Sequence, residues 1–218
     1  MADGRSDFYI GYEPRGPRRL ARRMRLVIAL LFALALALAA LLVGAQRSFD
    51  GGVFEFGVDR QLVGTLVEQP YPLLRVPGDD GAPARTHLLV GHGKHGAGPL
   101  VAGLDGRVVR VSGSPIHHGR HRMIEIHRVE TIDAVGGAMP SERAALGTMT
   151  LAGEIVDSKC HLGVMKPGRG KTHRACAVRC ISGGSPPLLR VEDRTGRVEL
   201  FLLVDEAGAS VNRRVLSM

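Results

Sequence analysis

The sequence contains no tryptophan, few other aromatic residues and only three cysteines. With an aromatic content of 4%, the stacking platforms that bind single-stranded nucleic acids are not expected. Three cysteines are also too few for a small domain that is held together by disulfides. Hydrophobic residues make up 44% of the 218 residues, so the chain can build a packed core and is not a disordered protein.

The formal net charge of +8 is unevenly distributed along the chain. Residues 1–25 contain seven arginines and three acidic residues, so this short tail carries a net charge of +4, half of the total. The remainder of the chain is therefore only mildly basic. Such a distribution does not indicate the continuous basic surface that nucleic-acid binding requires.

Residues 26–45 form a run without any charged or polar side chain. A helix of this length spans about 30 Å, which is the thickness of the hydrocarbon core of a bilayer. Six arginines precede the run within residues 15–25, whereas few charges follow it. The positive-inside rule therefore predicts a single-pass helix in the bacterial inner (cytoplasmic) membrane. The basic tail would lie in the cytoplasm and the body in the periplasm.

Two alternatives to a retained membrane anchor exist. A signal peptide cleaved after Val43-Gly44-Ala45 would also export the body, and a buried core helix would not. The apolar run is longer than the 7–15 residues of an ordinary signal sequence, and the segment before it is long. A retained anchor is therefore favoured.

The part of the chain after the anchor contains two copies of one β pattern. In each copy, a strand with an early glycine is followed by a strand led by a proline, a polar turn and an apolar strand. The copies occupy residues 62–90 and 151–204. Only the first copy is followed by two more strands, at residues 108–112 and 122–129. Five short strands with one helical insert are typical of a small OB-like barrel.

We therefore predict a mainly β protein with two small OB-like barrel modules behind one N-terminal transmembrane helix. The first β-barrel-like module spans residues 52–133, and a linker rich in small residues spans 134–147. The second β module, with a Cys/His insertion, spans residues 148–218. Because it has no counterpart of the last two strands, it is expected to be incomplete or to pair its edge with another chain.

All three cysteines lie in an insertion between the first two strands of the second copy. A helix is expected over residues 172–182, with Thr172 as the N-cap. On this helix His173, Cys176 and Cys180 share one face, because three- and four-residue spacings place side chains above one another. The glycine-rich loop before the helix can bring Cys160 over that face.

This arrangement predicts a metal site with four main ligands. Three thiolates and one imidazole suit zinc, copper or an iron centre. The predicted ligands are Cys160, His173, Cys176 and Cys180. His161 is an additional candidate ligand, and Asp157 can orient a ligand through a hydrogen bond.

Two other uses of the cysteines remain open. In an exported protein, Cys160 can form a structural disulfide with Cys176 or Cys180, which leaves one thiol. Alternatively, Cys176 near His173 and the helix N-terminus suits a redox or nucleophilic thiol. The chain has no Cys-x-x-Cys couple, no paired carboxylates and no Ser-His-Asp order. No catalytic residue is therefore predicted, and a non-enzymatic role is favoured.

Two other segments resemble ligand-binding motifs. Residues 168–172 resemble the end of a phosphate-binding loop, but Met165 stands where the pattern requires glycine, so no nucleotide is expected. Residues 91–96 are rich in glycine and histidine and can bind an anion, or a metal through His92 and His95. Solvated polar turn residues are the commoner explanation of such a segment.

The cysteine segment combines three short patterns: Gly-Glu-Ile-Val-Asp-x-x-Cys at 153–160, His-x-x-Cys-Ala-x-x-Cys at 173–180 and Gly-Gly-x-Pro at 183–186. It resembles an uncharacterised family of exported, membrane-anchored bacterial proteins. The opening residues 7–14, the arginine-rich stretch and the anchor are similar to members of the same group. The resemblance implies export and a Cys/His site, and it supplies no activity.

From these features we expect a membrane-anchored periplasmic accessory protein that binds a metal or metal centre through its Cys/His cluster. Its expected partners are the membrane and a protein of a respiratory or metal-handling complex in that membrane, and neither nucleic acid nor nucleotide. A periplasmic thiol redox protein or sensor is one alternative. A non-catalytic module whose cysteines form a structural disulfide is another.

Overall fold

The computed structural model describes residues 17–46, 51–78, 82–132 and 147–217. The chain forms two compact units, Met1–Ser48 and Phe49–Met218. Most of the predicted cytoplasmic tail and nearly all of the predicted linker at 134–147 lie outside the described residues. The proposed boundary between the two β modules therefore stays a prediction.

The first unit contains one long helix, α1 (Arg18–Ala45), in which no residue is buried. Its most apolar stretch has a mean hydropathy of 3.2, so the helix is long and apolar enough to cross a membrane. The expected N-terminal apolar helix is thus confirmed. A signal sequence has the same properties, and the topology and compartment stay predictions.

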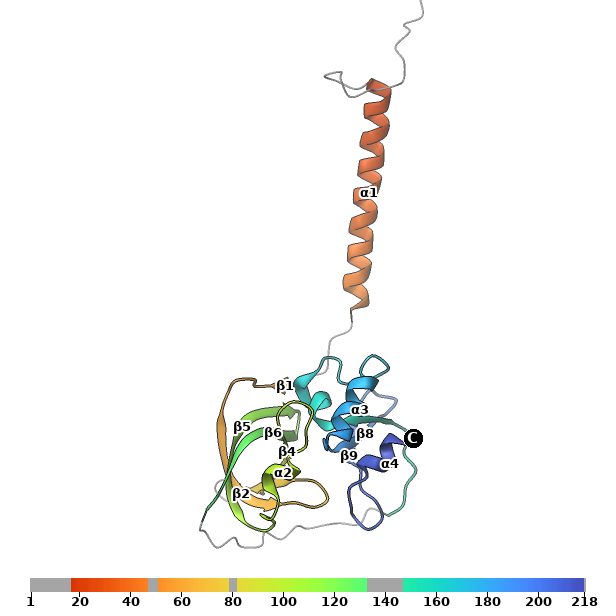
Figure 1. The fold of residues 1–218 in the computed structure, drawn as a ribbon. Coiled ribbons are helices and arrows are strands. Elements are labelled where there is room, and N and C mark those ends of the chain that lie inside the picture. Colours follow the sequence, from red (N-terminus) through yellow and green to blue (C-terminus); the bar gives the residue numbers. More distant parts are fainter. Residues whose placement is uncertain (1–16, 47–50, 79–81, 133–146, 218) are drawn as a thin grey trace, which may run out of the picture. The chain divides into compact units, whose positions relative to one another are not determined.

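The first β module is a closed barrel of five strands (Figure 1). Antiparallel pairs join β2 to β3, β3 to β4, and β5 to both β2 and β6, and a parallel pairing of β4 with β6 closes the barrel. A two-residue strand, β1, adds to the outside edge of β5. This topology confirms the expected order of five strands with one helical insert. The elements are β1 (Val53–Phe54), β2 (Arg60–Val67), β3 (Leu73–Val76), β4 (Arg85–Val90), α2 (Gly98–Val101), β5 (Val108–His118) and β6 (His121–Thr131).

Alternating side chains from the strands fill the interior of the barrel. Leu66, Leu74, Leu89 and Val109 are fully buried there together with Ile124. The hydrophobic effect of burying these branched side chains is the main stabilising contribution to the module. On β2 the positions between them are more exposed, as the alternation in the sequence predicts, whereas Leu89 and its neighbour Val90 on β4 are both buried.

The second module is an open antiparallel sheet of three strands in the order β7-β8-β9, within the part of the chain that the structure describes. The insertion between β7 and β8 forms a short helical turn, η2, and a helix, α3. A final helix, α4, packs against α3. The open sheet agrees with the expectation that this copy lacks the last two strands. The elements are β7 (Glu154–Asp157), η2 (Cys160–Val164), α3 (Arg174–Ser182), β8 (Pro187–Glu192), β9 (Val198–Leu202) and α4 (Asn212–Leu216).

The two copies of the β pattern agree in structural detail beyond the strands themselves. After the third strand of each copy, the chain forms one isolated antiparallel bridge, Val90 with Gly96 in the first and Val204 with Ser210 in the second. Each bridge is followed by a short helix, α2 or α4. The same order of strands, bridge and helix supports the internal duplication that the sequence suggests.

Each copy contacts the loop that follows the third strand of the other copy. The Tyr71 hydroxyl donates to the carbonyl of Leu203 and accepts a hydrogen bond from the Val211 amide, both at 3.0 Å. Conversely, the Lys159 ammonium donates to two carbonyl oxygens within residues 91–93, at 2.8 and 2.5 Å. Both side chains come from the segment between the first and second strands of their copy. The contacts are therefore reciprocal.

Candidate metal centre

Asp157 organises the segment that contains the cysteines. It is the last residue of β7 and is fully buried. Its Oδ1 accepts a hydrogen bond of 2.8 Å from the Cys160 amide, and its Oδ2 lies 2.9 Å from Nε2 of His173. One carboxylate thus fixes both the start of η2 and the residue just before α3. A buried carboxylate needs such partners, because burial without them is costly.

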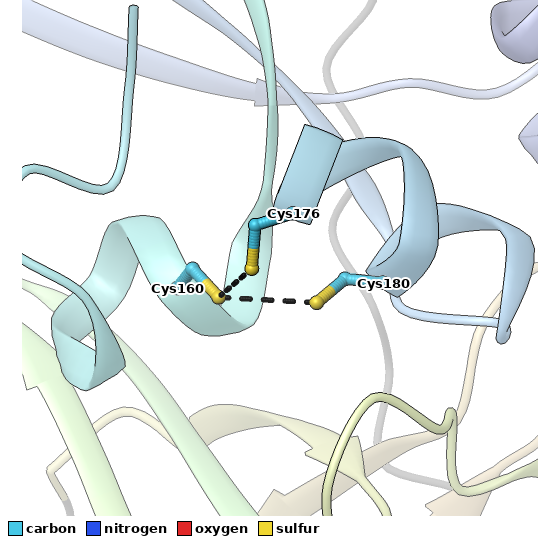
Figure 2. A group of neighbouring side chains, drawn as sticks. All are labelled: Cys160, Cys176 and Cys180. Carbon is cyan, nitrogen blue, oxygen red and sulfur yellow. Dashed lines mark hydrogen bonds between the residues drawn. The ribbon is translucent and has the colours of Figure 1, made fainter. Parts of the chain in front are cut away.

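The sulfur atoms of the three cysteines lie together, and all three are free thiols (Figure 2). Sγ of Cys160 is 3.8 Å from Sγ of Cys176 and 3.8 Å from Sγ of Cys180. A tetrahedral zinc site with Zn–S bonds of about 2.3 Å has sulfur–sulfur edges of about 3.8 Å. The two spacings at Cys160 therefore match the edges of a metal-thiolate tetrahedron.

Helix α3 and turn η2 set this spacing. Cys176 and Cys180 lie one turn apart on α3 and face the same side, and Cys160 begins η2 opposite them (Figure 2). Cys160 and Cys180 are buried, at 4% and 1% exposed, whereas Cys176 is only half-buried. Solvent can therefore reach the cluster at Cys176 more easily than at Cys160 or Cys180.

The N-cap of α3 differs from the expectation by one residue. The helix begins at Arg174 and has His173, not Thr172, as its N-cap residue, without a side-chain capping hydrogen bond. The amide of His173 instead bonds to the carbonyl of Gly170 in a turn, at 3.0 Å. The imidazole of His173 is held by Asp157 and is therefore buried rather than capping the helix.

A lysine from the barrel module reaches the cysteine cluster. Nζ of Lys94 donates a hydrogen bond of 2.7 Å to Sγ of Cys176. Lys94 lies in the loop of residues 91–96, which we call the lysine loop. This contact places a cation against the most accessible of the three sulfur atoms.

Lys159 holds the lysine loop through its backbone carbonyls and is almost fully buried between the two modules. Besides its bonds to the loop carbonyls, Nζ of Lys159 forms an ion pair with Glu125 on β6. Glu125 also contacts Nδ1 of the exposed His92 at 3.0 Å. A buried ammonium with three partners is compensated for the loss of water. The neighbour of Cys160 in the sequence therefore positions the loop that carries Lys94.

Close backbone contacts hold the other side of the lysine loop. The amide of Gly96 donates 2.8 Å to the carbonyl of Gly183, just after α3. A Cβ atom at Gly96 would collide with the backbone of Gly184, and one at Gly183 would collide with the carbonyl of Lys94. Glycine is required at these positions because the two backbones touch. The Gly-Gly pattern of residues 183–184 thus has a packing reason.

The thiols have different proton affinities. The hydrogen bond with Cys180 and then burial raise the pKa of Cys160 far above its usual range. The same hydrogen bond lowers the pKa of Cys180, because a thiol donor stabilises the thiolate form. The hydrogen bond therefore favours a proton on Cys160 over one on Cys180. The hydrogen bond with Cys176 raises the pKa of Lys94, so this side chain stays charged.

The residues can hold a metal ion in two overlapping groups. Ligand atoms of Cys160, Cys176 and Cys180 lie within 4.8 Å of one another, and so do those of Asp157, Cys160 and His173. Cys160 belongs to both groups and links them, whereas neither group contains His173 together with Cys176 or Cys180. Thiolates with one imidazole and a hydrogen-bonded carboxylate match the donors of structural metal sites.

The predicted ligand His161 has a different position from the other four. It lies on η2, is 3% exposed, and its ring centroid is 5.9 Å from that of His118 on β5. Among the described residues, it belongs to neither of the two groups of candidate ligands. The same is true of His92 and His95 in the lysine loop. Ligation by any of these residues, including the four main candidates, stays a prediction.

Sequence reasoning missed Lys94 and Lys159. Lys94 stands among glycines and histidines, and Lys159 stands beside a cysteine, so neither lysine forms a recognisable motif. The role of each depends on contacts between the two modules. The glycines on either side of Lys94 were a usable signal, because they indicate close backbone approach. The backbone that these glycines approach could not be predicted from sequence spacing.

No protein-family model, no curated protein and no solved structure matches this chain.

Proposed function

We propose that this chain is a membrane-anchored protein whose exported body binds one metal ion through Cys160, Cys176, Cys180 and His173. Asp157 orients the imidazole and the amide of Cys160, and Lys94 offsets the negative charge of the thiolates. The ion is zinc, copper or an iron centre, since thiolate-rich sites favour soft and borderline metals. The protein serves as an accessory factor and has no catalytic role of its own.

The observation that carries this proposal is the pair of 3.8 Å sulfur–sulfur spacings centred on Cys160. They agree with the edges of a tetrahedral site, and burial of two of the thiols protects bound metal from competing ligands. His173 supplies the fourth donor. Its hydrogen bond to Asp157 resembles the carboxylate–histidine pairs that support ligating imidazoles in other metal sites.

The proposed location is the bacterial inner membrane, with the arginine-rich tail in the cytoplasm and the body in the periplasm. The apolar helix α1 and the arginines that precede residues 26–45 support this orientation. The resemblance of the cysteine segment to exported, anchored bacterial proteins supports it as well. An anchor confines the metal site to the membrane plane, where a respiratory or metal-handling complex is the proposed partner.

The test is the metal content of the full-length chain purified in detergent from bacterial membranes. We expect about one metal ion per chain by mass spectrometry of the native protein and by elemental analysis. The substitutions Cys160→Ser, Cys180→Ser and His173→Ala should each lower the metal content at least about tenfold. His95→Ala is the matched control, because His95 is an exposed histidine outside both candidate groups.

Two results would contradict the metal proposal. One is a metal content that Cys160→Ser and Cys180→Ser leave unchanged. The other is a protein without metal whose mass is lower by two hydrogens, with one thiol that can be alkylated after denaturation. That second result would establish the structural disulfide instead.

A thiol redox role is the second candidate, and the contact of Lys94 with the accessible Cys176 favours it. In this role the Cys176 thiolate attacks a disulfide of a partner protein, and one partner sulfur leaves as a thiolate. Cys160 then displaces the other partner sulfur and forms a disulfide with Cys176, so two electrons reduce the partner to a dithiol. Oxidised glutathione is the probe. Loss of two hydrogens from the metal-free chain, blocked by Cys176→Ser, would support this role.

A further inference from the structure

A concave site lies at one end of the barrel. Its volume is about 540 Å³, within the usual range of small-molecule sites. It shares no lining residue with the cysteine cluster. Basic residues from three strands surround it: Arg60 at the start of β2, Arg85 at the start of β4 and Arg122 near the start of β6.

The strand alternation directs these side chains to the inside of the barrel. Arg85 is four residues before the core residue Leu89 on β4, and Arg122 is two residues before the core residue Ile124 on β6. Residues two or four apart on a strand face the same side. The arginines are thus at the open end of the same interior that the hydrophobic core fills.

Apolar side chains form the floor of this cavity. Leu62, Val76 and Ile124 line it, and all three belong to the hydrophobic core of the barrel or pack against it. The cavity therefore combines a basic rim with an apolar base. Ligand sites in proteins occur at barrel mouths and combine an apolar lining with a few polar groups that orient the ligand.

The arginines of the rim are not equivalent. Arg60 donates to Glu55 at 2.8 Å, so its charge is already paired. Arg85 and Arg122 form no ion pair with any residue that the structure describes. Two guanidinium groups without acidic partners therefore converge on an apolar cavity. Guanidinium groups bind carboxylate and phosphate through paired hydrogen bonds.

His87 lies between the two arginines. It is two residues after Arg85 on β4, and the parallel pairing of Leu88 with Met123 places it beside Arg122 on β6. Its Nδ1 atom is buried and forms no hydrogen bond of regular geometry with the described residues, although the ring also interacts with the backbone of Arg85. Buried polar atoms nearly always have a partner, so this nitrogen is a candidate contact for a ligand. Burial and the charge of Arg122 lower the pKa of His87, so the ring is neutral at pH 7.

We propose that the barrel end binds a small organic anion, a molecule that carries a phosphate or carboxylate group on an apolar body. Arg85 and Arg122 hold the anionic group, His87 contributes one hydrogen bond, and the apolar body packs on Leu62 and Val76. This binding site is independent of the metal centre.

The test is calorimetric titration of the full-length chain in amphipol with phenyl phosphate and with benzoate. Both should bind with a stoichiometry of about one and compete with each other, while neutral benzyl alcohol should not bind. Arg85→Gln and Arg122→Gln should each weaken binding about tenfold, and the double variant about a hundredfold. Arg128→Gln is the matched control, because Arg128 is an exposed arginine on the same strand as Arg122 and lies outside the cavity.

Circular dichroism and thermal unfolding of the double variant, measured in parallel, show that its fold is intact. Failure of both anions to bind would overturn the proposal, and so would binding that the double variant retains. Equal losses in Arg128→Gln and in the cavity variants would also overturn it, because they would indicate general attraction to a basic surface.

Discussion

The two copies of the β pattern share a scaffold and differ in what lies between their first and second strands. In the barrel copy, residues 60–101, five residues join β2 to β3. In the cysteine copy, residues 154–216, the corresponding connection contains η2, α3 and all three cysteines. The barrel copy is completed by β5 and β6, whereas the cysteine copy stays an open sheet among the described residues.

Because of this difference, the barrel copy contributes most of the buried core and the cysteine copy contributes the candidate metal ligands. The barrel copy builds a closed hydrophobic interior, which is the larger of the two buried clusters. Among the described residues, the cysteine copy forms no such closed interior and instead packs on the barrel, where Leu162 of η2 is fully buried against Val90, Ile116 and Met123. The barrel module also provides Lys94. The candidate metal centre is thus completed by the copy that has no cysteine.

Removal of the buried cation of Lys159 should have the largest effect on this docking. Lys159→Met leaves the carboxylate of Glu125 and two loop carbonyls without their donor. We expect a loss of about 3–5 kcal/mol in the free energy of unfolding, as for other buried pairs that lose one partner. Urea unfolding of the full-length chain, followed by circular dichroism, measures this loss.

The matched control for Lys159→Met is the double variant with Glu125→Gln, which removes both charges. It should recover a large part of the lost stability, because the cost arises from an uncompensated buried charge. If Lys159→Met unfolds at the same urea concentration as the wild type, the ion pair does not hold the two copies together.

The equivalent glycines of the two copies give the next largest effect. A Cβ atom at Gly64 in β2 would collide with the carbonyl of Arg75, and one at Gly153 before β7 would collide with the carbonyl of Arg190. Gly64→Ala should cost about 1–3 kcal/mol, since strands of a closed barrel cannot move apart. Gly153→Ala should cost less than half of that, because the open sheet can shift.

Thermal unfolding of the two glycine variants under identical conditions tests this difference between the closed and the open copy. For a body of this size, about 1 kcal/mol corresponds to a shift of about 2–4 °C in the midpoint. Equal shifts for both variants would show that the open sheet is as constrained as the barrel.

The reciprocal contact of Tyr71 should have a smaller effect than the buried lysine, because both of its partners are neutral. Tyr71→Phe removes the hydroxyl that bonds to Leu203 and Val211. The expected cost is about 1–2 kcal/mol. Hydrogen exchange at the Val211 amide should become faster, whereas exchange in the centre of β5 should stay unchanged. Unchanged protection at Val211 would contradict the contact.

The sequence predicted the barrel order and the grouping of the cysteines because both depend on local patterns. Strand alternation, turn residues and helical spacing are properties of short segments. The approach of Lys94 to Cys176 could not be predicted in this way, because it joins residues 82 positions apart in the chain. The N-cap position of His173 was missed for a related reason. Its buried bond to Asp157 depends on how β7 and α3 pack, and this overrides the capping preference of Thr172.

The smallest expected effect concerns the charge that the barrel module supplies to the cysteine copy. Lys94 is exposed, so Lys94→Met should leave the stability of the protein nearly unchanged. The metal-free variant should nevertheless react more slowly with iodoacetamide at Cys176, by roughly two- to fivefold, because it loses the cation that contacts Sγ and an exposed charge has only a modest effect. Lys171→Met, which removes an exposed lysine before α3, is the control and should react like the wild type. The sign is diagnostic: faster alkylation in Lys94→Met would mean that the lysine shields the sulfur from reagents rather than activating it.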